Sequence, residues 1–250
     1  MSKIIAANWK MNKLRSEATE TAKQLATEIT GGRVPKDRTI MVFPPFLSLA
    51  GVAEVFKAAP RTFVGAQNFY PKESGAFTGE ISLGMIRDCG ANWVLVGHSE
   101  RRHVLGESDE LIAEKTRFAL EQKFGVMLCI GETLEEREGG KLTEVFSRQL
   151  ETALAPVRAF GEDVLFKSLA IAYEPVWAIG TGKVAGEAEV SEAHALVKKL
   201  LGDLRSLPVL YGGSVKADNA SRLLSLDNVD GLLVGGASLA AESFLKIINA

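Results

Sequence analysis

The sequence predicts an α/β fold, a closed parallel eight-stranded β/α barrel in which residues 1–250 form one domain. Short, nearly continuous apolar runs alternate with longer amphipathic segments, and no low-complexity linker divides the chain. Runs that are apolar throughout are typical of strands covered on both faces, as in parallel sheets. The alternation occurs eight times, and eight strand–helix units in about 250 residues match the dimensions of such a barrel.

The apolar runs predict the strands, and the amphipathic segments predict the helices between them. In chain order the predicted strands are 4–8, 39–43, 63–66, 93–96, 126–130, 169–173, 209–211 and 232–234. The clearest helical patterns are 16–30, 107–122, 143–153 and 187–204. Within 107–122 one face is apolar, and it contains Leu111, Ile112, Phe118 and Ala119. The remainder is charged, with Glu114, Lys115 and Arg117. An open doubly wound sheet is the alternative, but a glycine-rich turn usually follows its first strand, and this chain has Asn8-Trp9-Lys10 there.

Composition excludes several classes of protein. The formal net charge is −2 with both signs scattered along the chain, which argues against a broad nucleic-acid surface. No apolar stretch approaches the ~20 residues of a membrane span, and residues 1–10 do not have the pattern of a signal peptide. Cys89 and Cys129 lie in apolar surroundings and predict buried free thiols in a reducing compartment. We therefore expect a cytoplasmic protein that binds neither nucleic acid nor membrane.

Two long segments interrupt the regular pattern. Residues 68–79 contain aromatic side chains and predict either a surface loop packed on itself or a protruding interface loop, and the pattern does not choose between them. Residues 175–185 are apolar at the centre, and exposure of Trp177 there would be costly unless the segment covered something, so we predict a lid. Val184 stands where a nucleotide-binding P-loop needs Ser or Thr, which excludes that motif. The predicted lid residues are Pro175, Val176, Trp177, Ala178, Ile179, Gly180, Thr181, Gly182, Lys183, Val184 and Ala185.

Residues at the carboxyl ends of barrel strands face a common site, which gives a short set of candidates. Glu174 follows the sixth run and is a candidate general base. Burial beneath the lid is expected to raise its pKa. His98 follows the fourth run and could polarise a carbonyl, while Asn8 and Lys10 follow the first and supply an amide and a positive charge. The plainer alternatives are an ordinary ion pair for Glu174 and a surface lysine for Lys10. The spacing of the three histidines fits no common zinc site, and we expect no metal.

Glycine pairs follow the last two predicted strands, in Gly212-Gly213-Ser214 and in Gly235-Gly236-Ala237-Ser238. Glycine lets the backbone approach a ligand, and the free amides at a helix start attract anions. Each motif alone could be a tight turn, but the pair at strands seven and eight predicts a phosphate site. Together with the four candidates above, it predicts proton transfer next to a carbonyl without a metal or redox cofactor.

At these positions the sequence resembles the triosephosphate isomerase family along its whole length. The resemblance rests on five stretches, which are Asn8-Trp9-Lys10-Met11-Asn12, the run from Val96 to Arg102, the run from Ala172 to Lys183, Tyr211-Gly212-Gly213-Ser214-Val215, and the run from Leu233 to Leu239. Each stretch is long and lies at an expected strand end. The family is a standard example of closure by a lid, and the resemblance implies that 175–185 closes over the site and excludes water.

The resemblance implies a role for each candidate. Glu174 removes a proton next to the carbonyl of dihydroxyacetone phosphate and returns it to the neighbouring carbon, as required in glycolysis and gluconeogenesis. His98 acts as a neutral imidazole because a helix starts just after it. Lys10 and Asn8 stabilise the enediolate, and loss of one such donor typically costs ~10²–10³ in rate. The phosphate is expected to bind main-chain groups at Gly180, Ser214, Gly235 and Gly236.

The resemblance also implies a homodimer without any cofactor. The loop 68–79 is then expected to insert into the partner near its Lys10 and Met11, with Phe77, Thr78 and Gly79 in the interface. Two stretches depart from the family pattern: Val184-Ala185-Gly186-Glu187 after the lid, and the short connection 202–208.

Two other functions remain open from the sequence. One is an aldolase-type barrel that uses Lys10 as a Schiff-base nucleophile, although no apolar pocket around Lys10 is evident. The other is a barrel that only binds a sugar phosphate or a protein partner.

Overall fold

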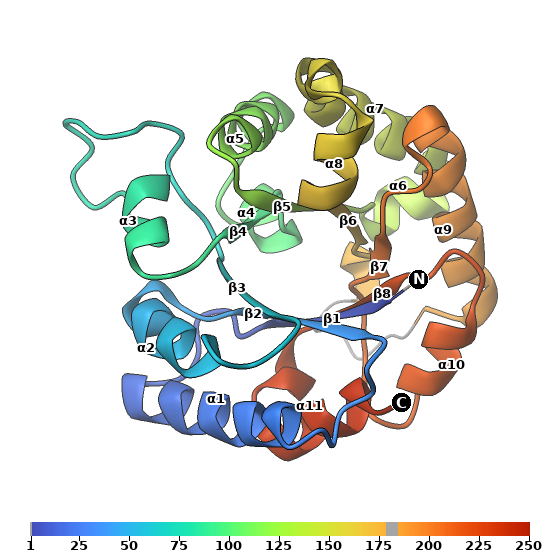
Figure 1. The fold of residues 1–250 in the computed structure, drawn as a ribbon. Coiled ribbons are helices and arrows are strands. Elements are labelled where there is room, and N and C mark those ends of the chain that lie inside the picture. Colours follow the sequence, from blue (N-terminus) through green and yellow to red (C-terminus); the bar gives the residue numbers. More distant parts are fainter. Residues whose placement is uncertain (1, 179–184) are drawn as a thin grey trace.

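Eight parallel strands close a barrel in the order in which they occur in the chain (Figure 1). The structure is a computed structural model that describes residues 2–178 and 185–250. The first and last strands pair with each other, from Ile4 with Gly231 to Ala7 with Val234, and this pairing completes the closure. The strands are β1 (Lys3–Asn8), β2 (Arg38–Phe43), β3 (Thr62–Ala66), β4 (Trp93–Val96), β5 (Gly125–Ile130), β6 (Leu169–Tyr173), β7 (Val209–Tyr211) and β8 (Gly231–Val234). The predicted fold is confirmed, and every predicted strand agrees to within one residue at each end.

Helices surround the barrel on its outside (Figure 1). Those in the described ranges are α1 (Arg15–Thr30), α2 (Phe46–Phe56), α3 (Leu83–Asp88), α4 (Ser99–His103), α5 (Asp109–Glu121), α6 (Leu134–Glu138), α7 (Leu142–Leu154), α8 (Glu162–Ser168), α9 (Glu187–Leu201), α10 (Ala220–Ser225) and α11 (Ala241–Ile248). Short 3-10 helices lie at Ala155–Phe160, Val176–Ala178, Gly202–Leu204 and Gly236–Ser238.

The strands are apolar throughout because both of their faces are buried. In β5, Val126, Leu128 and Ile130 belong to the large core between the strands and the helices. Met127 and Cys129 alternate with them and belong to a second apolar cluster inside the barrel. Successive side chains of a strand point to opposite faces, so a run without polar residues is what a strand between two cores requires.

Two predicted helices differ from those observed. The predicted helix 107–122 begins only at Asp109, because the hydroxyl of Ser108 caps it by accepting a hydrogen bond from the amide of Leu111 (3.3 Å). The placement of Lys115 on its solvent face was wrong, since Lys115 is buried and forms an ion pair with buried Glu107. The predicted helix 187–204 ends at Leu201, and a separate 3-10 turn follows it.

The loop 68–79 projects from the barrel between β3 and α3 (Figure 1). Its base is closed by a hydrogen bond from the Tyr70 amide to the Ile81 carbonyl (2.9 Å). Phe69 is buried and stacks on Phe118, whereas residues 72–80 are exposed. Among the helices in the described ranges, none combines the length and apolarity needed to cross a membrane.

Candidate active site

The carboxyl ends of the strands surround one cavity of about 360 Å³, a typical volume for a small-molecule site. It brings together residues from β1, β4, β6, β7 and β8 that lie far apart in the sequence. The sequence-predicted site residues that line it are Asn8, Lys10, His98, Glu174, Ser214, Gly235 and Gly236. Gly180 was also predicted to bind phosphate, and it lies outside the described residues.

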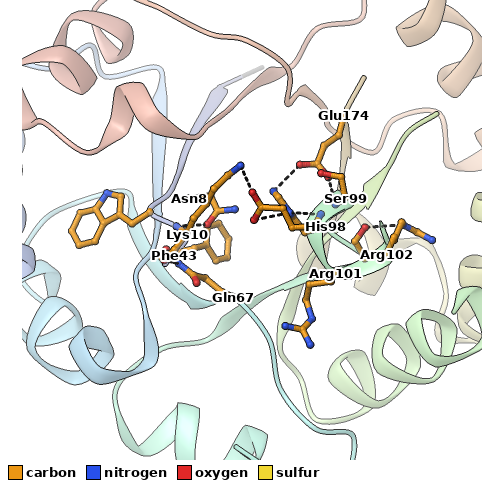
Figure 2. Close-up of polar contacts among 12 residues, drawn as sticks. Asn8, Lys10, Phe43, Gln67, His98, Ser99, Arg101, Arg102 and Glu174 are labelled. Carbon is orange, nitrogen blue, oxygen red and sulfur yellow. Dashed lines mark hydrogen bonds and ion pairs between the residues drawn. The ribbon is translucent and has the colours of Figure 1, made fainter. Parts of the chain in front are cut away.

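The end of β1 holds Lys10 in a left-handed backbone conformation, with φ at +51°. Such a conformation is uncommon for a residue other than glycine and persists only where neighbouring groups hold it. The Lys10 amide donates to Oδ1 of Asn8 (3.0 Å), and the Lys10 carbonyl accepts from Nε2 of Gln67 (3.0 Å). The same Gln67 nitrogen donates to the Phe43 carbonyl (2.8 Å). Gln67 therefore ties the turn to β2, a role that the sequence did not reveal (Figure 2).

Lys10 points into the cavity, where its Nζ lies 2.6 Å from Oε1 of Glu100 (Figure 2). Both side chains are partly exposed, so this ion pair contributes little to stability. It does direct a positive charge toward the space between β1 and β4, as the sequence predicted for an anionic substrate.

His98 caps the amino end of α4, and both of its ring nitrogens have a partner. Its Nδ1 accepts a hydrogen bond from the Glu100 amide (3.2 Å). Its Nε2 faces Oε1 of Glu174 at 2.9 Å. The helix start supplies the amide, as expected from the residues after β4.

Glu174 lies directly after β6 and is 2% exposed. Its Oε2 accepts a hydrogen bond from the Ser99 amide (2.8 Å), while Oε1 faces His98 (Figure 2). Burial by itself raises the pKa of Glu174, but electrostatic attraction to His98, the hydrogen bonds from His98 and the Ser99 amide, and the Lys10 charge outweigh it, and the pKa lies below its usual value. The prediction of a raised pKa was wrong, because it considered burial and omitted these donors.

The glycine motifs after β7 and β8 form the opposite wall of the cavity. Gly212 donates its amide to the Tyr173 carbonyl (2.7 Å), and a Cβ at Gly212 would lie 2.9 Å from Cγ of Glu174. Glycine at this position therefore leaves room for the carboxylate. Gly236 opens a 3-10 helix, whose first amides have no partner within the helix and can bind an anion.

The structure describes the predicted lid only from Pro175 to Ala178 and at Ala185, and its remaining residues, 179–184, lie outside the described ranges. The described part is attached to Glu132, a buried carboxylate that the sequence did not reveal. Oε1 of Glu132 accepts from Nε1 of Trp177 (2.9 Å) and from the hydroxyl of Tyr173 (3.1 Å). Nη1 of Arg137 also donates to this oxygen (3.3 Å), and burial raises the pKa of Glu132 more than these donors and this charge lower it.

The remaining candidates from the sequence do not line this cavity. Cys129 is buried inside the barrel, and burial and then the Glu174 charge hold the pKa of its thiol well above the usual value. Cys89 is only partly buried, contrary to expectation. His194 is fully buried against the rings of Tyr173 and Tyr211, and His103 is exposed. Within residues 2–178 and 185–250, no three His, Cys, Asp or Glu side chains are grouped to hold a metal.

The predicted interface residues lie on the surface of this protomer. Met11 is 96% exposed, next to the turn that holds Lys10. Phe77, Thr78 and Gly79 lie at the exposed end of the projecting loop, where the Phe77 ring packs on that of Tyr70 with centroids 4.6 Å apart.

Fold and site together define the class: a β/α-barrel enzyme with a buried carboxylate–imidazole pair beside an anion-binding wall. A family model described as triosephosphate isomerase matches residues 3–250. The chain is 55% identical to the triosephosphate isomerase of Nitratidesulfovibrio vulgaris (strain Miyazaki F) and 56% identical to that of Oleidesulfovibrio alaskensis, with all of both chains covered. It is 44% identical to that of Leptospira interrogans (serovar Lai), with 98% of each chain covered. The chain belongs to the triosephosphate isomerase family.

Proposed function

We propose that this protein interconverts dihydroxyacetone phosphate and D-glyceraldehyde 3-phosphate by moving a proton between two carbons through an enediolate, as an isomerase of glycolysis and gluconeogenesis. The observation that carries this proposal is the placement of Glu174 and His98 side by side, in the cavity that also contains Lys10 and both glycine motifs. A base, an electrophile and a fixed cation around one anion-binding space are the groups that such a proton transfer needs.

Glu174 is the proposed base. Its lowered pKa keeps the carboxylate ionised at neutral pH, ready to accept a proton from carbon. In this structure the carboxylate accepts hydrogen bonds from Ser99 and His98, and it must give these up to reach a substrate carbon. Gly212 supports this movement because it places no side chain against Cγ of Glu174.

His98 and Lys10 are the proposed partners of the substrate oxygens. The Nε2 proton of neutral His98 can polarise the carbonyl and then transfer to the developing alkoxide. The Lys10 ammonium and the Asn8 amide border the same cavity and oppose the negative charge of the enediolate. Preorganised donors of this kind stabilise the transition state more than the bound substrate.

The phosphate is proposed to bind between the two glycine motifs, at main-chain groups of Ser214, Gly235 and Gly236, with Gly180 contributed by the lid. Closure of 175–185 over this space would exclude water and protect the enediolate from losing phosphate. The attachment of Trp177 to Glu132 gives the lid a fixed hinge at its amino end.

The direct test is isomerase activity of the purified protein. We expect conversion of glyceraldehyde 3-phosphate in a coupled assay without added metal or nucleotide, and deuterium at the reacting carbon of material recovered from D₂O. Borohydride trapping with substrate should leave Lys10 unmodified, since its ammonium is paired with Glu100 and acts as a charge. Labelled Lys10, or no isomerase activity, would contradict the proposal.

We also propose that the chain is one domain that works as a homodimer in the cytoplasm. The β1–β8 pairing joins both ends of the chain in one barrel, and two free cysteines suit a reducing compartment. The exposed loop 68–79 and exposed Met11 support a partner contact next to Lys10, since such apolar groups are typical of interfaces. Sedimentation should give twice the mass of the chain, and a negative charge introduced at Thr78 (T78D) should weaken the dimer.

A further inference from the structure

We propose that Arg102 is a positioning residue, which sets the distance between His98 and Glu174 by tying the end of β4 to the end of β5. The proposal rests on the proposed function, because it assumes that this pair carries out the proton transfer. The side chain of Arg102 extends away from the pair and does not line the cavity (Figure 2).

The guanidinium of Arg102 uses three of its nitrogen atoms on three different partners. Nε donates to the Gly97 carbonyl (2.7 Å), and Nη2 donates to the Cys129 carbonyl (3.0 Å). Nη1 donates to Oδ1 of Asp109 at the start of α5. The side chain is only 7% exposed, so these bonds are protected from competition with water.

The two carbonyls lie at the ends of β4 and β5, where β4 leads into His98 and β5 is the neighbour of β6, which leads into Glu174. Gly97 directly precedes His98, and its position therefore sets that of the imidazole. Cys129 precedes Ile130, whose carbonyl accepts the amide hydrogen of Glu174 (2.8 Å). The pairing of β4 with β5 ends at Val96 and Leu128, so Gly97 and Cys129 lie just beyond it. Arg102 supplies the connection between the two strands at this point.

The site is shaped for a planar, forked cation. Gly97 has φ at +71°, and a Cβ there would lie 2.9 Å from Nη2 of Arg102 and 3.1 Å from the Cys129 carbonyl oxygen. Glycine therefore permits both the backbone turn into His98 and the approach of the guanidinium. A lysine ammonium carries its donors on one atom and cannot span the same three acceptors.

Asp109 balances the charge of buried Arg102, and a second arginine bound to the same carboxylate, Arg148, provides a matched control. Its Oδ1 is bound by Arg102, and its Oδ2 accepts from Nε of Arg148 (3.0 Å). The side chain of Arg148 is 48% exposed, and its other ion pair in the described chain is with Glu136 at 3.8 Å. Arg148 thus shares the carboxylate with Arg102 but does not join the strand ends.

The test compares R102K with R148K in the full-length enzyme. For R102K we expect kcat to fall about 10- to 100-fold, because small displacements of catalytic groups have effects of this size, while KM changes less than about twofold. For R148K we expect both constants to stay within about twofold of the wild type. Equal losses of kcat in the two variants, or an unchanged kcat in R102K, would overturn the proposal.

A spectroscopic readout separates positioning from mere loss of folded protein. In the ligand-free wild type, ¹⁵N NMR should show His98 with a protonated Nε2 and an unprotonated Nδ1. R102K should shift or broaden the His98 Nε2–H signal, and R148K should leave it in place. An unshifted signal in R102K contradicts the proposal. If R102K does not fold, D109N takes its place, since this variant keeps an acceptor but removes the charge that orients Arg102. The His98 Nε2–H signal should then shift or broaden in D109N, and an unshifted signal contradicts the proposal.

The two proposals can fail separately. A wild-type protein without isomerase activity rejects the proposed function, whereas the NMR comparison still measures whether Arg102 places His98.

Discussion

Two buried glutamates at neighbouring strand ends, Glu174 after β6 and Glu132 after β5, have opposite pKa shifts. Both are nearly inaccessible, at 2% and 0% exposure. Glu174 accepts a hydrogen bond from the Ser99 amide, faces the His98 ring and lies near the Lys10 charge, and its pKa is lowered. Oε1 of Glu132 accepts from Tyr173, Trp177 and the Arg137 guanidinium (3.3 Å), its Oε2 has no partner within the described structure, and burial still raises its pKa. Each carboxylate has a cation nearby, so the direction of its pKa shift depends on the balance between burial and the whole set of donors and charges around it.

The comparison predicts the largest effect for neutralising Glu174. E174Q removes the base and should lower kcat/KM for glyceraldehyde 3-phosphate by about 10³-fold, because general base catalysis contributes on this scale. The variant should remain folded, since the glutamine amide oxygen can still accept from Ser99. Full activity of E174Q would remove Glu174 from the mechanism.

A third buried group, His194, extends the comparison to a base. Burial lowers the pKa of His194 to about 4, with Asp230, Lys198 and Lys3 as its charged neighbours. Because the folded state binds the proton less tightly than the unfolded state, the stability that the neutral ring contributes is complete above pH ~6.5 and is lost as pH falls toward 4. The loss should reach about 3 kcal/mol between pH 7 and pH 4.

Urea unfolding of the wild type and H194Q, at one fixed protein concentration, measures this loss. The glutamine variant should lack the part of the pH dependence that His194 causes. Parallel stability curves for the two proteins between pH 7 and pH 4 would show that His194 does not titrate on unfolding.

Removal of one donor should move Glu174 toward the behaviour of Glu132. Ser99 is the first residue of α4, where proline is tolerated, and the backbone of His98 (φ −52°, ψ 142°) is compatible with a following proline. S99P therefore removes the amide that Glu174 accepts. The pKa of Glu174 should rise, and the acid limb of kcat/KM should move to higher pH by about one unit. S99A keeps the amide and should retain the wild-type profile.

The smallest effect is expected for neutralising Glu132. E132Q keeps an acceptor for Tyr173, Trp177 and Arg137, and Arg137 retains its ion pair with Glu192, so the free energy of unfolding should lie within about 1 kcal/mol of the wild type. The raised pKa of Glu132 means that the folded wild type holds the proton more tightly than the unfolded chain. The stability contributed by the protonated carboxyl is complete below the unfolded pKa and is lost as pH rises through the folded pKa. Chemical unfolding at several pH values should therefore show E132Q gaining relative to the wild type between pH 4 and pH 7. A large loss at pH 7 would show that Glu132 is ionised.

The strands were predictable because their signal is local. Each is an unbroken apolar run, and the residues that the prediction omitted, such as Lys3, Arg38 and Gly231, are the polar or glycine residues at the amino ends of strands. The motifs at the carboxyl ends were equally visible, because the barrel places every such end at one rim. Lys115 was misplaced because a charged residue on a helix reads as solvent-facing, whereas Glu107 and Asn68 bind it in the interior.

The sequence by itself determined the barrel, the family and the residues available for chemistry, since these depend on the order of apolar runs and strand-end motifs along the chain. Only the tertiary structure decided what each residue is bound to. The pairing of His98 with Glu174, the lowered pKa of Glu174 and the bridging contacts of Gln67, Glu132 and Arg102 all depend on atoms from segments distant in sequence. Hydrogen bonds and charges act over a few ångströms of space, and the spacing of residues along a chain does not specify those distances.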